Sequence, residues 1–140
     1  MFRRTRRPPF GAIRRQGTAT IEFAMIAPIL FLIVFGIVET GRALMVQQLL
    51  TNASREGARH AIIESSTSEE TRQIVLNFLD NCSVMGAEIE VTPENLATLG
   101  PGDNVSVEIT IPLEKVSWVP VLNVNISLTA KTIMKAERFE

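Results

Sequence analysis

A carboxylate inside an apolar segment is the first residue of this sequence that requires a partner. Glu22 is the one charged residue in segment 18–38. An ionised carboxylate at the centre of a bilayer costs about 2.5–3.5 kcal/mol on insertion scales, and less near an interface. A cut between Gly17 and Thr18 would create an α-amino group at Thr18. Thr18 lies four residues before Glu22, on the same face of a helix. That amine could neutralise Glu22 in the same chain or in an adjacent one.

The same carboxylate has a second explanation that needs no cut. In an uncut chain, Glu22 would lie at the level of the lipid headgroups, where it would pair with Arg14, Arg15 or lipid. The residue types alone leave both alternatives open.

The rest of the sequence lacks the usual patterns of a catalytic or metal site. One cysteine, Cys82, and one histidine, His60, exclude an internal disulfide and a Cys-rich or His-rich metal centre. Glu88 and Glu90 would share one face of a strand, but such surface carboxylates are ordinary. No phosphate-binding loop, zinc-protease motif or nucleophile elbow occurs. We therefore expect no enzyme activity, metal, cofactor or small-molecule substrate.

Charge is divided between the start of the chain and the rest. The 140 residues have a formal net charge of −1, which argues against nucleic acid as a partner. Residues 1–17 nevertheless hold six arginines and no acid, whereas residues 18–140 hold 8 basic and 15 acidic residues, a net −7. A basic arm before an apolar segment places the N-terminus in the cytoplasm by the positive-inside rule. Residues 1–17 are thus expected to be a basic cytoplasmic leader.

The apolar segment is long enough to cross a membrane. Residues 18–38 would extend about 31 Å as a helix, close to the ~30 Å hydrocarbon core of a bilayer. We expect a transmembrane helix over 18–41, kinked or melted by one turn at Pro28. A buried core helix is disfavoured because the segment has no polar face. A cleaved secretory signal is disfavoured because no Ala-x-Ala site follows.

The helical pattern continues beyond this span. We expect residues 42–64 to extend the same helix outside the membrane, loosened at Gly36 and Gly41, because apolar and small residues recur at i, i+3 and i+4. The apolar face comprises Val46, Leu49, Leu50, Ala53, Gly57 and Ala61, and the polar side comprises Gln47, Thr51, Ser54, Arg55 and Arg59.

Ala53, Gly57 and Ala61 repeat every four residues and form a ridge of small side chains. Such a ridge lets another backbone approach closely. It can pack on the protein's own globular part, which we favour, or on a neighbouring subunit.

Residues 65–140 are expected to form an α+β domain. Thr67 or Ser68 can cap a second, short helix over 69–81. Residues 87–92, 105–111 and 125–133 alternate between polar and apolar side chains, which predicts three half-buried strands. We expect a small antiparallel three-stranded sheet laid against a helix. The apolar side chains expected to point inward are Ile74, Val75, Phe78 and Leu79 on the helix, and Val105, Val107, Ile109, Ile111, Ile126, Leu128 and Ala130 on the strands.

One run of residues, from about 16 to 61, follows a known pattern. Gly17 would precede a cut, Glu22 would be the fifth residue of the mature chain and Phe23 the sixth, as at a prepilin-peptidase site. The segment resembles the TadE-like family, minor pseudopilins of the tight-adherence (Flp) pilus machinery. The residues that carry the rest of this resemblance are Pro28, Gly36, Glu39, Gly41, Arg42, Gln48, Asn52, Arg55, Glu56, Gly57 and Arg59.

The resemblance implies a pilin-like fold and a role in assembling a surface pilus, hence in adhesion or biofilm formation. It implies that a prepilin peptidase removes residues 1–17. The chain would then cross the bacterial inner membrane once, with residues 65–140 in the periplasm. Its partners would be other pilin or pseudopilin subunits and the pilus assembly platform. The alternative is an uncleaved, membrane-anchored periplasmic binding or scaffold domain.

Overall fold

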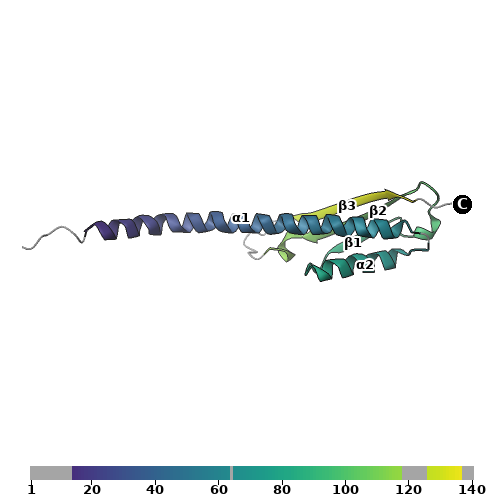
Figure 1. The fold of residues 1–140 in the computed structure, drawn as a ribbon, viewed down its shortest axis with the longest axis horizontal. Helices are drawn as coiled ribbons and strands as arrows, with labels where there is room; N and C mark the ends of the chain where they lie inside the picture. Colours follow the sequence, from purple (N-terminus) through teal and green to yellow (C-terminus); the bar gives the residue numbers. More distant parts are fainter. Residues whose placement is uncertain (1–13, 64, 118–125, 137–140) are drawn as a thin grey trace, which may run out of the picture. The chain divides into compact units, whose positions relative to one another are not determined.

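The computed structural model describes residues 14–63, 65–117 and 126–136. Two helices, α1 (Arg14–Ala61) and α2 (Ser68–Asn81), precede a sheet of three antiparallel strands in the order β1-β2-β3. The strands are β1 (Glu88–Thr92), β2 (Asn104–Pro112) and β3 (Ser127–Lys135), and two 3-10 turns, η1 (Leu96–Thr98) and η2 (Leu113–Lys115), flank β2 (Figure 1). This α+β arrangement confirms the predicted fold class. The chain divides into two compact units, residues 1–38 (unit 1) and 39–140 (unit 2).

Helix α1 begins at Arg14 and stays helical through Pro28, Gly36 and Gly41. The predicted melting of one turn at Pro28 is therefore wrong, whereas the kink expected there and the loosening expected at the two glycines stay predictions. A proline inside a helix removes one backbone hydrogen bond. Unwinding a whole turn in an apolar environment would leave several more backbone groups unsatisfied, at several kcal/mol each.

The core of unit 2 lies between one face of the sheet and the two helices. The inward residues of β2 are those that the alternation predicted, namely Val105, Val107, Ile109 and Ile111, and each is at most 1% exposed. From the helices come Val46, Leu50, Ala53, Ala58, Ala61, Val75 and Leu79, all buried. Ile74 and Phe78, which we also expected inward, are only half-buried.

Side chains satisfy backbone N–H groups at the start of helix α2 that have no partner within the helix. The Thr67 hydroxyl accepts a hydrogen bond from the Glu70 N–H, and the Glu70 carboxylate accepts one from the Thr67 N–H. This reciprocal pair is a capping box, in which two otherwise orphaned N–H groups are satisfied. It selects Thr67 over Ser68 as the cap. The Ser68 hydroxyl instead donates to the Glu94 carbonyl, which ties the start of α2 to the chain after β1.

The small-residue ridge of α1 packs inside unit 2. Ala53, Gly57 and Ala61 are all buried. A Cβ built on Gly57 would lie 2.5 Å from Cγ2 of Val75 and 3.3 Å from Cγ1 of Val107. Gly57 is therefore where α2 and β2 approach α1 most closely. Of the two alternatives for the ridge, the structure shows packing on the chain's own globular part.

Ser54 corrects the predicted polar side of α1. Its side chain is fully buried. The hydroxyl donates to the Thr51 carbonyl at 3.0 Å and lies 2.8 Å from Oγ1 of Thr132 on β3. The buried stripe of a helix that packs on a sheet is broad, and a hydroxyl tolerates burial when its hydrogen bonds are made.

Strand β3 is displaced from its predicted position. It covers Ser127–Lys135 rather than 125–133, and Ile126, expected inward, is 49% exposed ahead of it. The expected inward side of Leu128 and Ala130 is confirmed, since Leu128 is half-buried and Ala130 buried. The register with β2 pairs Ser127 with Pro112 and Lys135 with Asn104.

The close approach at Gly57 gives a test with a matched control on the same helix. Replacing a helical glycine by alanine gains up to about 1 kcal/mol of helix propensity. At Gly41 a Cβ would meet no atom within 4 Å, so Gly41→Ala should raise the melting temperature. At Gly57 overpacking costs about 1–3 kcal/mol, so Gly57→Ala should lower it. Thermal unfolding of the detergent-solubilised chain measures both, and equal stabilisation by the two variants would contradict the close packing.

Candidate functional site

Unit 1 exposes apolar side chains on every side. All large apolar residues between 21 and 38 are between 47% and 75% exposed. Transfer of one such side chain out of water is favourable by roughly 1.5–3 kcal/mol, so water is a poor environment for this surface. The helix Gly17–Ala61 is long and apolar enough to cross a membrane, and its most apolar window has no buried residue. The part of this helix that lies in unit 1 is therefore within a candidate membrane span, as we predicted.

The residues of the predicted cleavage motif lie at the start of α1. Gly17, Thr18, Glu22 and Phe23 are all exposed, and a Cβ on Gly17 would meet no atom within 4 Å. Gly17 lies in the first turn of α1, where backbone N–H groups have no partner within the helix. The 17–18 bond can therefore become extended without unwinding much of the helix. Thr18 and Glu22 stand one turn apart; the cut itself stays a prediction.

Two residues of the motif region hold α1 against the rest of unit 2. The Arg42 Nε donates to the Val116 carbonyl at 2.5 Å, which joins α1 to the chain after η2. Gly57 gives the close approach to α2 and β2 described above. Glu39 is half-buried, and Gly41 is exposed.

The other motif residues of unit 2 point outward. Asn52, Arg55, Glu56 and Arg59 are exposed. In the described ranges, no ion pair joins Arg55, Glu56 or Arg59 to another residue. They form a solvated face, so the structure brings together only part of the motif.

Sequence analysis missed two polar contacts between α1 and β3. The Gln47 Nε2 donates to the Thr129 carbonyl at 2.9 Å, and Ser54 meets Thr132. Both Gln47 and Ser54 flank the apolar face of the helix. This position was the one feature of the sequence that could have indicated their contacts with β3. A periodicity of apolar residues cannot distinguish a flanking polar residue that bonds a neighbouring strand from one that faces water.

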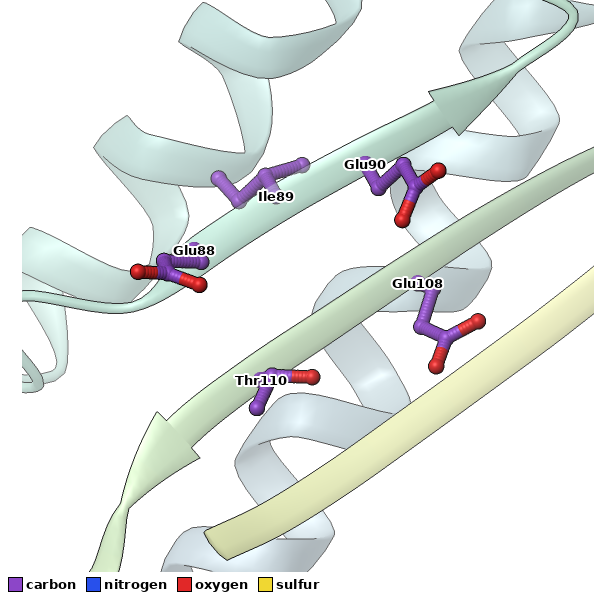
Figure 2. A pocket seen from close by; sticks show the side chains of 5 residues that line it. All are labelled: Glu88, Ile89, Glu90, Glu108 and Thr110. Atoms are coloured by element: carbon purple, nitrogen blue, oxygen red, sulfur yellow. The ribbon is translucent and has the colours of Figure 1, made fainter.

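The outer face of the sheet carries a shallow hollow lined by carboxylates (Figure 2). Glu88 and Glu90 come from β1, and Glu108 and Thr110 from β2, with Glu90 opposite Glu108 in the register. Within the described residues, no group of three or more His, Cys, Asp or Glu side chains is placed to hold a metal ion. The hollow also lacks a nucleophile paired with a base, so it offers no evident catalytic chemistry.

Lys131 from β3 partly balances this acidic face. Its Nζ lies 2.9 Å from Oε2 of Glu108. The hydrogen bond to Glu108 and then its negative charge, with a smaller contribution from Glu90, raise the pKa of Lys131 above 10.5, although desolvation opposes this. Because the pKa of Lys131 is raised in the folded state, its ion pair with Glu108 stabilises the fold fully at pH values below the pKa of the unfolded state. This stabilisation is lost as the pH rises through the pKa of the folded state.

The ion pair gives a prediction for alkaline pH. Glu108→Gln should return the pKa of Lys131 toward its ordinary value, because both the charge and the carboxylate acceptor disappear. Glu88→Gln is the control, because Glu88 does not contribute to the pKa shift of Lys131. NMR titration of the lysine side chain measures this pKa, and an unchanged value in Glu108→Gln would contradict the assignment.

Comparison with known proteins identifies one segment of the chain. No curated protein and no solved structure matches it. Residues 17–59 match the family model described as "TadE-like protein". These boundaries agree with the resemblance over about 16 to 61 and include the predicted cleavage motif as well as Ala53 and Gly57 of the ridge. Over residues 17–59 the chain is therefore similar to TadE-like proteins, as the sequence pattern indicated, and we call these residues the TadE-like segment.

Proposed function

We propose that this chain is a single-pass membrane pseudopilin that takes part in the assembly of a tight-adherence (Flp) pilus. The observation that carries the proposal is the run of exposed apolar side chains on α1 in unit 1, which follows Gly17-Thr18 and lies inside the TadE-like segment. TadE-like proteins are associated with this pilus system, so the segment links the chain to pilus assembly. The role is structural rather than enzymatic, and it serves surface adhesion and biofilm formation.

The charge distribution supports one orientation in the bacterial inner membrane. The six arginines of residues 1–17 stay in the cytoplasm. Unit 2, which is acidic, then lies on the periplasmic side. The span would occupy about residues 18–41.

Processing by a prepilin peptidase after Gly17 would give Glu22 its partner. The new amine of Thr18 and the Glu22 carboxylate are four residues apart on an exposed part of α1. In an apolar environment, the two charges attract strongly, and this attraction offsets part of the cost of burying them. If the amine instead meets Glu22 of an adjacent subunit, the same pair sets the axial register between two helices.

The packing of unit 2 directs contacts between subunits to other surfaces. Because Ala53, Gly57 and Ala61 are buried in the chain's own core, this ridge is not available to a neighbour. The helix of unit 1 remains as the apolar surface on which other pilin subunits and the assembly platform can pack.

Intact-mass measurement of the membrane-extracted protein tests the processing step. In cells with an active prepilin peptidase, we expect a chain that begins at Thr18, and in cells lacking the peptidase a chain that begins at Met1. A Met1 chain in both strains would overturn the processing step and favour the uncleaved, membrane-anchored periplasmic binding or scaffold domain.

Glu22→Ala tests the assembly step separately. We expect normal membrane insertion, since the substitution makes the span more apolar, together with loss of pilus output, because the Thr18 amine loses its counter-charge. Asp80→Ala, which removes an exposed carboxylate of α2, is the matched control and should leave pilus output unchanged. Normal pilus output from Glu22→Ala would count against the assembly role.

A further inference from the structure

The exposed apolar side chains of unit 2 gather at one end of it. Within the described part of this unit, seven large apolar side chains are at least 36% exposed. Four of them lie either in the first turns of α1 within unit 2 or in segments that hydrogen bonds connect to those turns. These four are Leu44 (61%), Met45 (57%), Met85 (70%) and Ile126 (49%).

Three hydrogen bonds show that these segments share one end of the sheet. The Arg42 Nε donates to the Val116 carbonyl, the Lys115 Nζ donates to the Gly86 carbonyl at 3.0 Å, and the Leu113 N–H donates to the Ile126 carbonyl at 2.8 Å. They join the first turns of α1 in unit 2, the turn before β1, and the chain between β2 and β3. We call this end, residues 39–45, 85–86, 113–116 and 126, the base of unit 2.

The chain places the base close to the membrane that unit 1 is proposed to cross. Along an α-helix, Leu44 lies about 4.5 Å beyond Gly41, the last residue of the proposed span, and Met45 about 6 Å. The headgroup layer adds roughly 5–8 Å to each side of the hydrocarbon core. Since α1 is continuous through these residues, the apolar side chains of the base follow the span within or just beyond the thickness of this layer.

The charges of the base balance one another. Glu39 and Glu114 are acidic, and Arg42 and Lys115 are basic. A neutral base has little electrostatic attraction to anionic lipid. Any contact with the membrane would therefore come from its apolar side chains.

We propose that the base of unit 2 lies in the headgroup layer of the membrane, with Leu44, Met45, Met85 and Ile126 against lipid. The inference rests on the proposed membrane span of unit 1. Contact with lipid then involves segments of unit 2 that are distant from α1 in sequence.

Site-specific fluorescence in vesicles tests this contact. Cys82 is the only cysteine of the chain, so Cys82→Ser gives a background for single labels in the full-length protein. Met85→Cys labels the base. Ile133→Cys is the matched control, because Ile133 is 60% exposed but lies near the opposite end of β3. Leu32→Cys labels the span itself. Each protein carries the environment-sensitive dye NBD and is reconstituted in zwitterionic phosphatidylcholine vesicles at low protein density.

The expected result is a blue-shifted emission at position 85, with loss of intensity when doxyl-labelled lipid is present. Position 133 should show neither effect, and position 32 should show both. Aqueous behaviour at 85 with quenching at 32 would overturn the base contact but leave the membrane span intact. Aqueous behaviour at 32 would overturn the span and this inference with it. Shielding at 85 that rises with protein density and resists doxyl lipid would identify a second chain as the occupant and overturn the lipid contact.

Discussion

The surface of α1 must suit two environments along a single hydrogen-bonded helix. In unit 1 the side chains between 23 and 38 are uncharged around the whole circumference, and the large apolar ones lie exposed. In unit 2 the same helix is apolar on one broad stripe, which the sheet and α2 cover. A bilayer requires the first pattern and a globular core requires the second. The sheet, α2 and the cap at Thr67 are all arranged to cover that stripe.

This division determines which surfaces are left for other molecules. The stripe is occupied by the chain's own core, and close packing at Gly57 leaves no room for another backbone. The outer face of the sheet is polar, and Glu90 opposite Glu108 is an unfavourable cross-strand pair that Lys131 relieves. Such a face resists close apolar association. Neighbouring helices are therefore better accommodated by unit 1 than by this face of the sheet.

Much of this arrangement follows from periodicity in the sequence. The alternation of Val105, Val107, Ile109 and Ile111 predicted which side of β2 is buried, and the uncharged segment predicted the candidate span.

The wrong predictions arose where hydrogen bonds or strand limits that the local sequence does not show outweighed a local rule. Pro28 is a helix breaker by propensity, yet backbone bonds on either side keep α1 intact. Ser54 is polar, but Thr132 on a strand distant in sequence accommodates its hydroxyl. Ile126 fits the alternation of a strand that begins one residue later. The predicted processing motif has a local spacing within one helix, whereas the base of unit 2 assembles from four segments and has no local signature.

The distribution of charge explains why apolar contact suits the base. Unit 2 holds 8 basic and 14 acidic residues, so it is repelled as a whole by anionic headgroups. That repulsion is screened beyond a Debye length of about 8 Å at physiological ionic strength, so it matters most for groups nearest the surface. At the base, Arg42 and Lys115 offset Glu39 and Glu114, whereas the carboxylates of Glu88, Glu90 and Glu108 lie on the outer face of the sheet. The part of unit 2 that follows the span most closely is thus nearly neutral and bears exposed apolar side chains, which is the composition that a headgroup layer tolerates.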